Sequence, residues 1–291
     1  MNRQVGIVGV GLIGASIGRA LKERNLCRRV IGIGRSPHSL AEAMNAGAID
    51  EAHERIGPEL SQAEFVIVAT PVPLVVEMVR RLWTVVSPEA VITDVASTKG
   101  SILDALDRLD PYHQRVAEFV GSHPMAGSHK RGPAASDPDL FVGRTCVVVR
   151  GRRTSDLTFD RVSAFWRSLG MDVQEMPAVE HDERVARISH LPHVASFALA
   201  LACHEQDLLL AGPGFRDTTR LAGSPPALWA EILKENRPQV LPAIDSFLEK
   251  LSELRSLIEQ EQWDELEMKL RDANRIMGLL GNSSHPRSSG V

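Results

Sequence analysis

The sequence has few cysteines and no strong excess of charge of either sign. Its 291 residues include only Cys27, Cys146 and Cys203, an odd set without a CxxC pair, which argues against a disulfide framework and a thiolate metal site. No histidine pair has a carboxylate at metal-ligand spacing, so we expect no metal. The 33 Lys and Arg residues against 37 Asp and Glu give a net charge of −4, which leaves no basic field for nucleic-acid phosphates. We therefore expect no nucleic-acid partner.

The sequence also lacks an apolar run long enough to cross a membrane. The longest run, LPHVASFALALAC at residues 191–203, falls short of the ~20 residues that a spanning helix needs, and we interpret it as a buried helix. The N-terminus, MNRQVGIVGVG, begins a strand almost at once and leaves no room for a cleavable secretion signal. We expect a cytoplasmic protein without a membrane partner, and a reducing compartment suits the cysteine usage.

Short β-branched runs alternate with amphipathic helical stretches from residue 5 to about residue 176. This pattern is typical of an α/β fold, and most of the runs are apolar throughout, as in strands buried on both faces. We predict a Rossmann-type, doubly wound parallel sheet over residues 1–176. The six expected strands are VGIVGV (5–10), RRVIGI (28–33), EFVIVAT (64–70), AVITDV (90–95), RVAEFVG (115–121) and TCVVVR (145–150).

The second part of the chain is compatible with helix almost throughout. We predict a C-terminal all-helical domain over residues 177–281 that binds substrate and a second subunit, followed by a polar, disordered tail at 282–291. Residues 247–280 keep apolar side chains at spacings of three and four, which indicates an amphipathic helix or helix pair. This stripe is either a core-facing surface or a subunit interface, and the long apolar stripes favour a homodimer through the helical domain.

A glycine-rich turn follows the first expected strand. GVGLIG places Gly9, Gly11 and Gly14 in GxGxxG spacing, with Leu12 and Ile13 between them, immediately before a helical stretch. Gly9 would permit the tight turn, Gly11 would let a pyrophosphate approach the backbone, and Gly14 would let helix and strand pack closely. The motif predicts a dinucleotide site.

The end of the second expected strand bears on the choice of cofactor. An NAD site usually has an acidic residue here to bind the adenosine ribose, whereas this chain has Gly34, Arg35 and Ser36. A guanidinium and a hydroxyl suit a 2′-phosphate, so we predict NADP, with NAD as the alternative. Arg35 stacked on the adenine face would accommodate either cofactor.

Polar residues follow the next strands at the edge of the sheet where ligands bind. The residues expected near the nicotinamide are Thr70, Pro71, Asp94, Ser97 and Lys99. Ser97 is equally explained as a helix N-cap when it is considered alone. The next strand leads into GSHPMAGSH at residues 121–129, where we expect His123 on a loop at the same edge.

Five motifs together resemble the prephenate and arogenate dehydrogenases of tyrosine biosynthesis. They are GVGLIG, DVASTKG, GSHPMAGS, ISHLPH and FRDTTRLAGSPPALW, and the resemblance runs from about residue 4 to about residue 280. It implies an oxidative decarboxylation in which hydride leaves the ring carbon that bears the 4-hydroxyl, the ring carboxylate leaves as carbon dioxide, and the ring becomes aromatic. Prephenate would give 4-hydroxyphenylpyruvate, and arogenate would give tyrosine. The sequence leaves the two substrates open.

The resemblance also implies roles for single residues. His123 stands at the position of the catalytic base, and a neutral imidazole suits proton transfer from the ring hydroxyl. Ser97 would hydrogen-bond the same hydroxyl or hold the imidazole. Arg220 would bind a substrate carboxylate, His193 would contact a carboxylate or the side chain, and Trp229 matches a family tryptophan that is equally explained as a core residue. We include Asp217 among the substrate-site residues, beside Arg216, which is either a second carboxylate ligand or an ion-pair partner of Asp217.

Of the other histidines, only His190 belongs to a motif, ISHLPH. We expect His190 to orient a neighbour, and His38, His53, His113, His181, His204 and His285 to lie at the surface or at helix caps. His129 stands where the family commonly has an acidic residue, which puts in doubt any gating or feedback that depends on that acid.

Two other functions share the cofactor motif. The β-hydroxyacid dehydrogenases use a lysine of their helical domain, but neither Lys234 nor Lys250 lies in a motif that resembles theirs. A non-catalytic, dinucleotide-binding redox sensor is the second alternative.

Overall fold

A computed structural model describes residues 4–109, 116–127 and 130–282. The chain divides into two compact units, residues 1–237 and 238–291. The expected tail lies outside the described residues from position 283 on, as do His113, His129 and His285.

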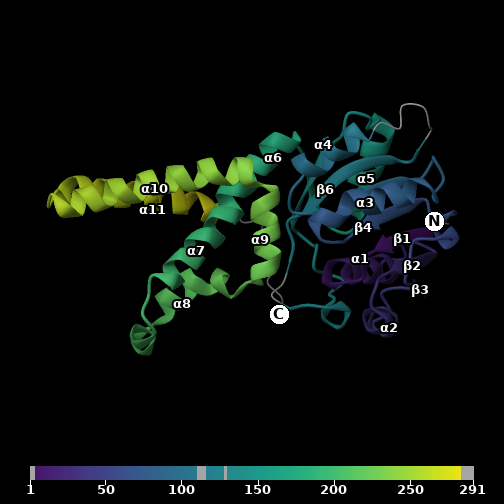
Figure 1. The fold of residues 1–291 in the computed structure, drawn as a ribbon, viewed down its shortest axis with the longest axis horizontal. Helices are drawn as coiled ribbons and strands as arrows, with labels where there is room; N and C mark the ends of the chain where they lie inside the picture. Colours follow the sequence, from purple (N-terminus) through teal and green to yellow (C-terminus); the bar gives the residue numbers. More distant parts are fainter. Residues whose placement is uncertain (1–3, 110–115, 128–129, 283–291) are drawn as a thin grey trace. The chain divides into compact units, whose positions relative to one another are not determined.

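The first unit contains an eight-stranded sheet in the order β3-β2-β1-β4-β5-β6-β7-β8 (Figure 1). The six predicted strands are confirmed, and the sequence reading missed two short, polar ones. The strands are β1 (Gln4–Val8), β2 (Arg29–Ile33), β3 (Glu51–His53), β4 (Phe65–Val68), β5 (Val91–Asp94), β6 (Glu118–Pro124), β7 (Thr145–Arg150) and β8 (Asp172–Glu175). The missed strands are β3 and β8, which lie at the two edges of the sheet and lack the apolar run that marks a buried strand.

The sheet is mostly but not wholly parallel. Strands β1 to β6 pair in parallel, β7 runs antiparallel to β6, and β8 is parallel to β7. The prediction of a parallel sheet therefore holds for the first six strands and is wrong at β7. A buried apolar run such as TCVVVR shows that a strand is covered on both faces, but it carries no information about strand direction.

Helices cover both faces of the sheet, as predicted. One apolar layer contains residues of α1 (Leu12–Glu23), α2 (Pro37–Asn45) and α5 (Asp156–Ser168), and it includes the fully buried Trp166. The other contains residues of α3 (Val72–Trp83) and α4 (Gly100–Arg108). Adjacent strand residues such as Ile7 and Val8 contribute to opposite layers. Short 3₁₀ turns at Pro58–Leu60 (η1) and Pro133–Ala135 (η2) complete this part.

The order of the strands locates a ligand crevice. Because β1 lies between β2 and β4, the chain first builds the sheet outward on one side of β1 and then on the other, and ligands bind at the carboxyl ends of the strands at such a switch point. The residues that follow β1, β4 and β5 therefore share one edge.

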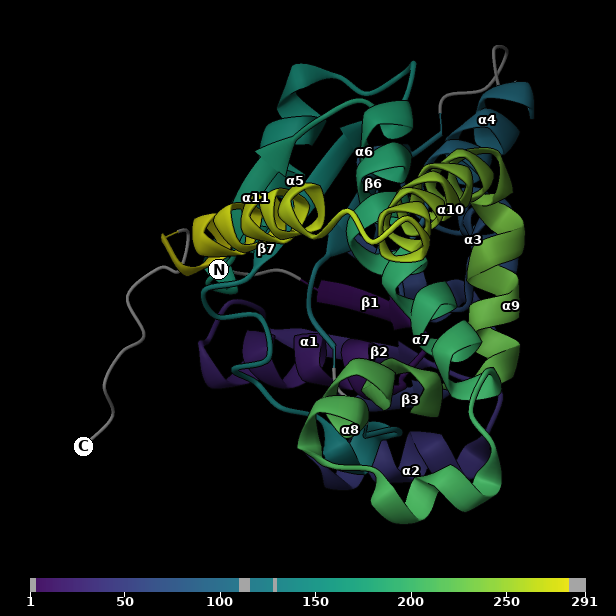
Figure 2. The same ribbon diagram turned by 90° about the vertical axis from the view of Figure 1, so that its left-hand side faces the viewer.

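The helices after residue 177 continue the first unit. They are α6 (Ala178–Val185), a single π turn η3 (Ala186–His190), α7 (Leu191–Leu201), η4 (Glu205–Leu210), α8 (Pro213–Thr219), η5 (Arg220–Gly223) and α9 (Pro226–Glu235). Helix α6 lies beside β6 (Figures 1 and 2). The π turn is a feature common at functional sites, and it contains the first three residues of the ISHLPH motif.

The prediction that the apolar run at residues 191–203 forms a buried helix is wrong. In α7 only Ser196 is buried, and Leu201 is 86% exposed. The prediction assumed that an apolar helix is covered by its own chain, whereas this one leaves large side chains uncovered.

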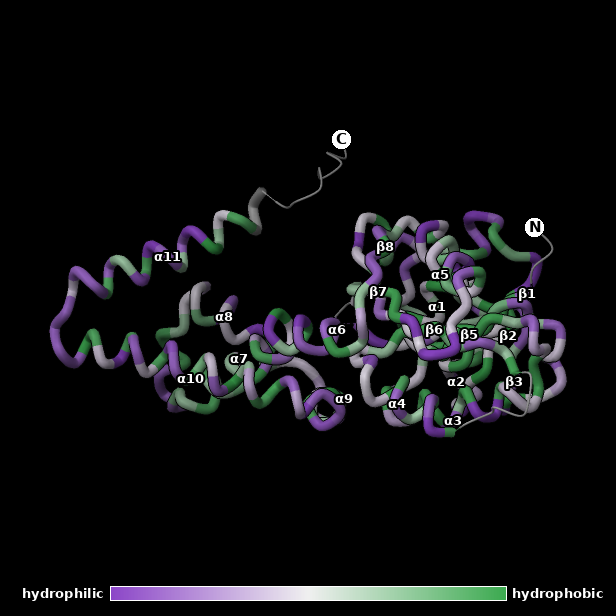
Figure 3. Tube along the Cα trace, turned by 90° about the horizontal axis from the view of Figure 1, so that it is seen from above, coloured by the Kyte–Doolittle hydropathy of each residue, from purple (hydrophilic) through white to green (hydrophobic). Residues whose placement is uncertain are grey.

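The second unit is formed by α10 (Arg237–Glu259) and α11 (Trp263–Asn282), which confirms a helix pair over residues 247–280. Glu261 adopts φ 57° in the turn between the helices, and Lys269 Nζ of α11 lies 2.6 Å from Glu253 Oε1 of α10. Hydrophobic and hydrophilic residues alternate along both helices (Figure 3), and many of the apolar ones are exposed, among them Leu251 and Met277. None of the helices within the described ranges is long and apolar enough to cross a bilayer.

Candidate active site

The glycine-rich turn after β1 is held by close backbone contacts. Gly9 has φ +100°, a conformation that favours glycine, and its N–H donates to the Ile33 carbonyl at 2.8 Å. A Cβ on Gly9 would lie 2.3 Å from the Ala69 carbonyl oxygen, and one on Gly14 would lie 2.0 Å from the Gly9 carbonyl oxygen. The turn thus brings α1, the end of β1 and the end of β4 into direct backbone contact.

Gly11 differs from the other two glycines because no atom of the described residues lies within 4 Å of where its Cβ would be. It is the N-cap of α1, with no side-chain cap, and Leu12 and Ile13 are the first residues of that helix. The first N–H groups of a helix have no acceptor within the helix, and together with the helix dipole they form a site for an anion. The residues therefore fit the pyrophosphate of a dinucleotide.

The end of β4 adds polar groups to the same edge. The Thr70 hydroxyl oxygen is buried and has no hydrogen-bond partner among the residues that the structure describes, which is the condition of a group that a bound ligand would satisfy. Pro71 follows it as the exposed N-cap of α3.

The adenosine end is open. Arg35 is exposed and forms no ion pair within the described parts of the chain. Ser36 is the N-cap of α2, and its hydroxyl oxygen accepts a hydrogen bond from the Ser39 N–H at 3.2 Å. That oxygen therefore has a structural role, while its proton is still available to a ligand.

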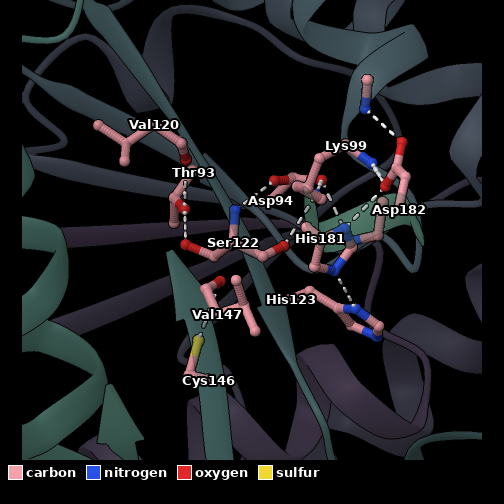
Figure 4. A network of polar contacts seen from close by, with 12 residues as sticks. Thr93, Asp94, Lys99, Val120, Ser122, His123, Cys146, Val147, His181 and Asp182 are labelled. Atoms are coloured by element: carbon pink, nitrogen blue, oxygen red, sulfur yellow. Dashed lines mark hydrogen bonds and ion pairs between the residues drawn. The ribbon is translucent and has the colours of Figure 1, made fainter. Parts of the chain in front are cut away.

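Asp94 and Lys99 form an ion pair with both side chains fully buried. Lys99 Nζ also donates to the Ser122 carbonyl at 2.8 Å, and Asp94 Oδ1 accepts from the Ser122 N–H at 2.8 Å (Figure 4). The pair ties β5 and α4 to β6 directly before His123. Although both residues lie at the predicted edge, their charged groups bind each other and the backbone.

Ser97 lies two residues before Lys99, which is the N-cap of α4 and has no side-chain cap bond. The interpretation of Ser97 as the N-cap is therefore wrong. Its side chain is half-buried at the carboxyl end of β5.

His123 lies within β6 and not on the loop that we expected after it. Its register partner in β7 is Val147, because β6 continues through Pro124. Pairing with β7 fixes the backbone of His123 on one side. Its imidazole is half-buried, and Nδ1 lies 2.8 Å from Nε2 of His181.

His181 contradicts the expectation of a surface or cap residue. It is fully buried on α6, and its Nδ1 lies 2.7 Å from Asp182 Oδ1. Asp182 also accepts hydrogen bonds from the backbone N–H groups of Lys99 at 2.9 Å and Gly100 at 2.8 Å. His123, His181 and Asp182 form a continuous hydrogen-bonded chain (Figure 4).

Burial, hydrogen bonds and neighbouring charges set the protonation of Asp182 and His123. Burial alone would raise the pKa of Asp182, but its hydrogen bonds from His181, Lys99 and Gly100 hold that pKa below the ordinary value. Burial, followed by the neighbouring His181, Lys99 and His190, holds the pKa of His123 well below its ordinary value. His123 is therefore neutral at physiological pH, as a proton acceptor must be.

A cavity of about 1030 Å³ lies beyond the end of β6. His193 and Trp229 stack in it with ring centroids 3.4 Å apart and an interplanar angle of 22°. Arg220 contributes its guanidinium, and burial holds the pKa of His193 below its ordinary value with Arg220 adding to the effect. The lining residues are Ala126, Gly127, Lys130, Arg131, Ser189, His193, Arg220, Leu221, Gly223, Ser224, Pro225, Leu228 and Trp229.

His190 connects the cavity to the histidine chain. It is buried, and Nδ1 lies 3.1 Å from the side-chain amide nitrogen of Asn236, which also donates to the Asp182 carbonyl at 2.8 Å. Burial lowers the pKa of His190 to about 4. The three rings lie close enough to interact electrostatically, so a positive charge on His190 would lower the pKa of both His123 and His193.

Not every predicted residue joins this site. His193, Arg220 and Trp229 line the cavity together, whereas Asp217 and Arg216 lie exposed on α8, outside its lining, with no ion pair between them among the interactions of the described residues. Sequence reasoning missed His181, Asp182 and Asn236. A usable signal was present for two of them, because His181 and Asp182 share a helical face with the apolar Ala178, Val185 and Ala186.

Comparison with known proteins identifies relatives over almost the whole chain. The family model described as prephenate dehydrogenase, nucleotide-binding domain, matches residues 17–175, and the one described as prephenate dehydrogenase, dimerization domain, matches residues 177–272. The prephenate dehydrogenase of Bacillus subtilis is 34% identical over 89% of this chain and 71% of its own length.

Two solved structures share the fold closely. The prephenate dehydrogenase of A. aeolicus in complex with hydroxyphenyl propionate and NAD⁺ has a TM-score of 0.88 at 31% identity, covering 96% of this chain and 99% of that one. Synechocystis arogenate dehydrogenase has a TM-score of 0.82 at 30% identity, covering 95% and 99%. A (S)-3-hydroxybutyryl-CoA dehydrogenase from Ralstonia eutropha, at 19% identity and a TM-score of 0.53, shares the fold alone.

Proposed function

The chain belongs to the prephenate dehydrogenase family, and from this premise we propose that it converts prephenate to 4-hydroxyphenylpyruvate with His123 as the catalytic base. It is a nicotinamide-dependent oxidoreductase of tyrosine biosynthesis. The observation that carries the assignment of the base is a neutral imidazole held by a hydrogen bond through its Nδ1 at the carboxyl edge of the sheet, on the motif shared with the family.

The reaction requires a base that takes a proton and gives it back. A dinucleotide held by the glycine turn at Gly9, Gly11 and Gly14 would supply the nicotinamide that accepts the hydride from the ring carbon bearing the hydroxyl. His123 removes the proton of that hydroxyl as the carbon becomes a carbonyl. Loss of carbon dioxide then returns its electron pair to the ring, and the resulting phenolate oxygen takes the proton back from His123. Atoms and charges balance without a net proton, which is why one imidazole of low pKa suffices.

The cavity supplies a guanidinium and an imidazole for the two substrate carboxylates. We assign one carboxylate to Arg220, whose planar fork suits bidentate binding, and a contact with the other or with the side chain to His193. Trp229 stacks on His193 and so holds its ring, which supports a role in the site for this tryptophan. Ser97, after the end of β5, remains our candidate for a hydrogen bond to the ring hydroxyl. The lining of the cavity does not support the predicted substrate-binding role of Asp217.

The charge of the cavity lining favours prephenate over arogenate. Among the described residues, its lining contains the cations Arg131 and Arg220 and the ring of His193 but no Asp or Glu. Arogenate carries an ammonium where prephenate carries a keto group, and an ammonium in this cavity would meet cations without a carboxylate to pair with. Since like charges suppress binding, we expect kcat/KM for prephenate to exceed that for arogenate by about 10-fold or more, equivalent to roughly 1.4 kcal/mol.

We assign the dinucleotide site to Gly9, Gly11, Leu12, Ile13, Gly14, Thr70 and Pro71, with Arg35 and Ser36 at the adenosine end. The exposed Arg35, with no carboxylate beside it in the GRS segment, supports NADP as the preferred cofactor, and NAD is the alternative. Replacing Arg35 with Asp should shift the ratio of kcat/KM values toward NAD by about 10-fold or more. Arg108→Asp, on the exposed end of α4, should leave the ratio unchanged.

We further propose that residues 1–176 bind the dinucleotide and that residues 177–281 bind substrate and a second copy of the chain. The family model over residues 177–272 describes a dimerization domain, and the exposed apolar side chains of α7, α10 and α11 support a homodimer. The cytoplasmic location stays a prediction. Among the described residues Cys27, Cys146 and Cys203 are free thiols.

One experiment tests the central proposal. The purified chain is offered prephenate or arogenate with NADP or NAD, and the absorbance of reduced nicotinamide is followed. We expect the largest rate with prephenate and NADP. A largest rate with arogenate would overturn the charge argument, and no turnover with either substrate would overturn the proposed function. His123→Asn should then lower kcat by about 100-fold or more while both ligands still bind.

A further inference from the structure

The proposed function needs a base at His123 but leaves the adjoining His181 and Asp182 without a role. Both are buried on α6, 58 or more positions along the chain from His123, and they match none of the motifs. A buried carboxylate and a buried imidazole are costly unless their hydrogen bonds are satisfied. The hydrogen bonds of Asp182 and His181 can be satisfied by only one arrangement of donors and acceptors, and that arrangement fixes where His123 carries its proton.

The Asp182 carboxylate determines which atom donates in each hydrogen bond from Asp182 through His181 to His123. Asp182 is ionised, so it accepts hydrogen bonds and donates none. Its Oδ1 receives the Lys99 N–H and its Oδ2 receives the Gly100 N–H, which orients the carboxylate from the start of α4. The ring nitrogen Nδ1 of His181, 2.7 Å from Oδ1, must therefore carry a proton and donate it.

The second step concerns Nε2, the other ring nitrogen of His181. A neutral imidazole with its proton on Nδ1 has a lone pair on Nε2, and that atom lies 2.8 Å from Nδ1 of His123. His123 must therefore donate through Nδ1, which leaves its own lone pair on Nε2. The reaction requires this tautomer, because only a lone pair on the outer nitrogen can accept the hydroxyl proton.

We infer that His181 and Asp182 are a positioning pair that selects the Nδ1–H tautomer of His123 and stabilises the imidazolium formed on it during turnover. This inference rests on the proposed function. The transient positive charge on His123 is shared along the chain toward the Asp182 carboxylate, and no proton has to leave the protein, since the phenolate oxygen takes it back. The arrangement acts in the same way as the carboxylate that orients the histidine of a serine protease.

Two substitutions at His181 test the pair. Gln places an amide nitrogen and an oxygen at about the separation of the ring nitrogens, so it can donate to Asp182 and accept from His123, whereas Leu can do neither. We expect His181→Leu to lower kcat by about 100-fold or more with KM within about threefold, and His181→Gln to keep kcat within about 10-fold.

A spectroscopic measurement tests the tautomer without turnover. Protein labelled with ¹⁵N-histidine, with His123→Gln to identify the resonance of that ring, should show His123 protonated at Nδ1 in the resting enzyme. Asp182→Asn should change this pattern, and circular dichroism shows whether each variant is folded. If Asp182→Asn does not fold, His181→Leu serves the same comparison.

The outcomes separate this inference from the proposed function. An inactive wild-type chain with prephenate and arogenate sinks the proposed function, while the tautomer measurement still decides the role of the pair. An active wild type whose folded His181→Leu variant keeps its kcat would overturn the inference, as would a His123 ring protonated at Nε2. Equal losses in the Gln and Leu variants would also overturn it, because the loss would then be structural.

Discussion

The buried ion pair between Lys99 and Asp94 provides the sharpest test of what holds His123 in place. Both side chains are fully buried, and Lys99 Nζ also binds the Ser122 carbonyl, one residue before the base. Burial lowers the pKa of Lys99, and the charge of Asp94 opposes that effect. Each charge is therefore tolerated only because the other is present.

Replacing Lys99 with Met should destabilise the fold by about 3–5 kcal/mol. The change leaves the Asp94 carboxylate buried with only the N–H groups of Ser122, at 2.8 Å, and Ala96, at 3.1 Å, to compensate its charge. A second change, Asp94→Asn, removes the uncompensated charge and keeps an oxygen for the Ser122 N–H. We expect the double variant to recover about 2 kcal/mol or more relative to Lys99→Met alone.

Urea unfolding followed by circular dichroism and tryptophan fluorescence measures both free energies. The control is Lys22→Met, which removes an ion pair with Asp50 whose side chains are both about one-third exposed, and it should cost about 1 kcal/mol or less. The reasoning fails if Lys99→Met costs no more than Lys22→Met, or if the double variant is as unstable as the single one.

Three further predictions concern the cofactor turn, acid stability and the substrate cavity. The Cβ of Gly11→Ala would meet no atom of the described residues, so this variant should change stability by about 1 kcal/mol or less while weakening dinucleotide binding about 10-fold or more. The Cβ of Gly14→Ala would lie 2.0 Å from a backbone oxygen, so this variant should fail to form the turn. Calorimetry with and without cofactor distinguishes the two. The folded pKa of His190, about 4, lies below its unfolded value of ~6.5, so its stabilising contribution is present above pH 6.5 and is lost as pH falls toward 4. Between pH 7 and pH 5 this should amount to about 2 kcal/mol, and stability that falls equally in wild type and in His190→Gln would contradict it. Arg220→Gln should raise KM for prephenate by about 10-fold or more with little change in kcat, whereas Arg216→Gln, outside the cavity lining, should leave KM unaltered.

Much of the first unit was predictable because its signals are local. A GxGxxG turn is marked by residue types within six consecutive positions between a strand and a helix, and the φ of +100° at Gly9 is a property of the turn itself. The apolar runs of the six central strands follow directly from burial on both faces. The motifs around His123, His193 and Arg220 were visible for the same reason, since each is a short, continuous segment.

The chain of His123, His181 and Asp182 was not predictable in this way. Around the segment EHDERVAR an apolar helical face indicates that one side of the helix is buried, but nothing local shows that β6 lies against His181. The burial of His181, the antiparallel direction of β7 and the exposure of Leu201 all depend on what packs, or does not pack, on a segment distant in sequence.

The sequence alone thus determined the strands, the glycine turn and the family motifs, because these depend on residue types at short spacing. Only the tertiary structure decided which buried groups face one another, since hydrogen bonding between residues 123 and 181 requires α6 to pack beside β6. That packing converts an ordinary pair of polar residues on α6 into the partners of the base.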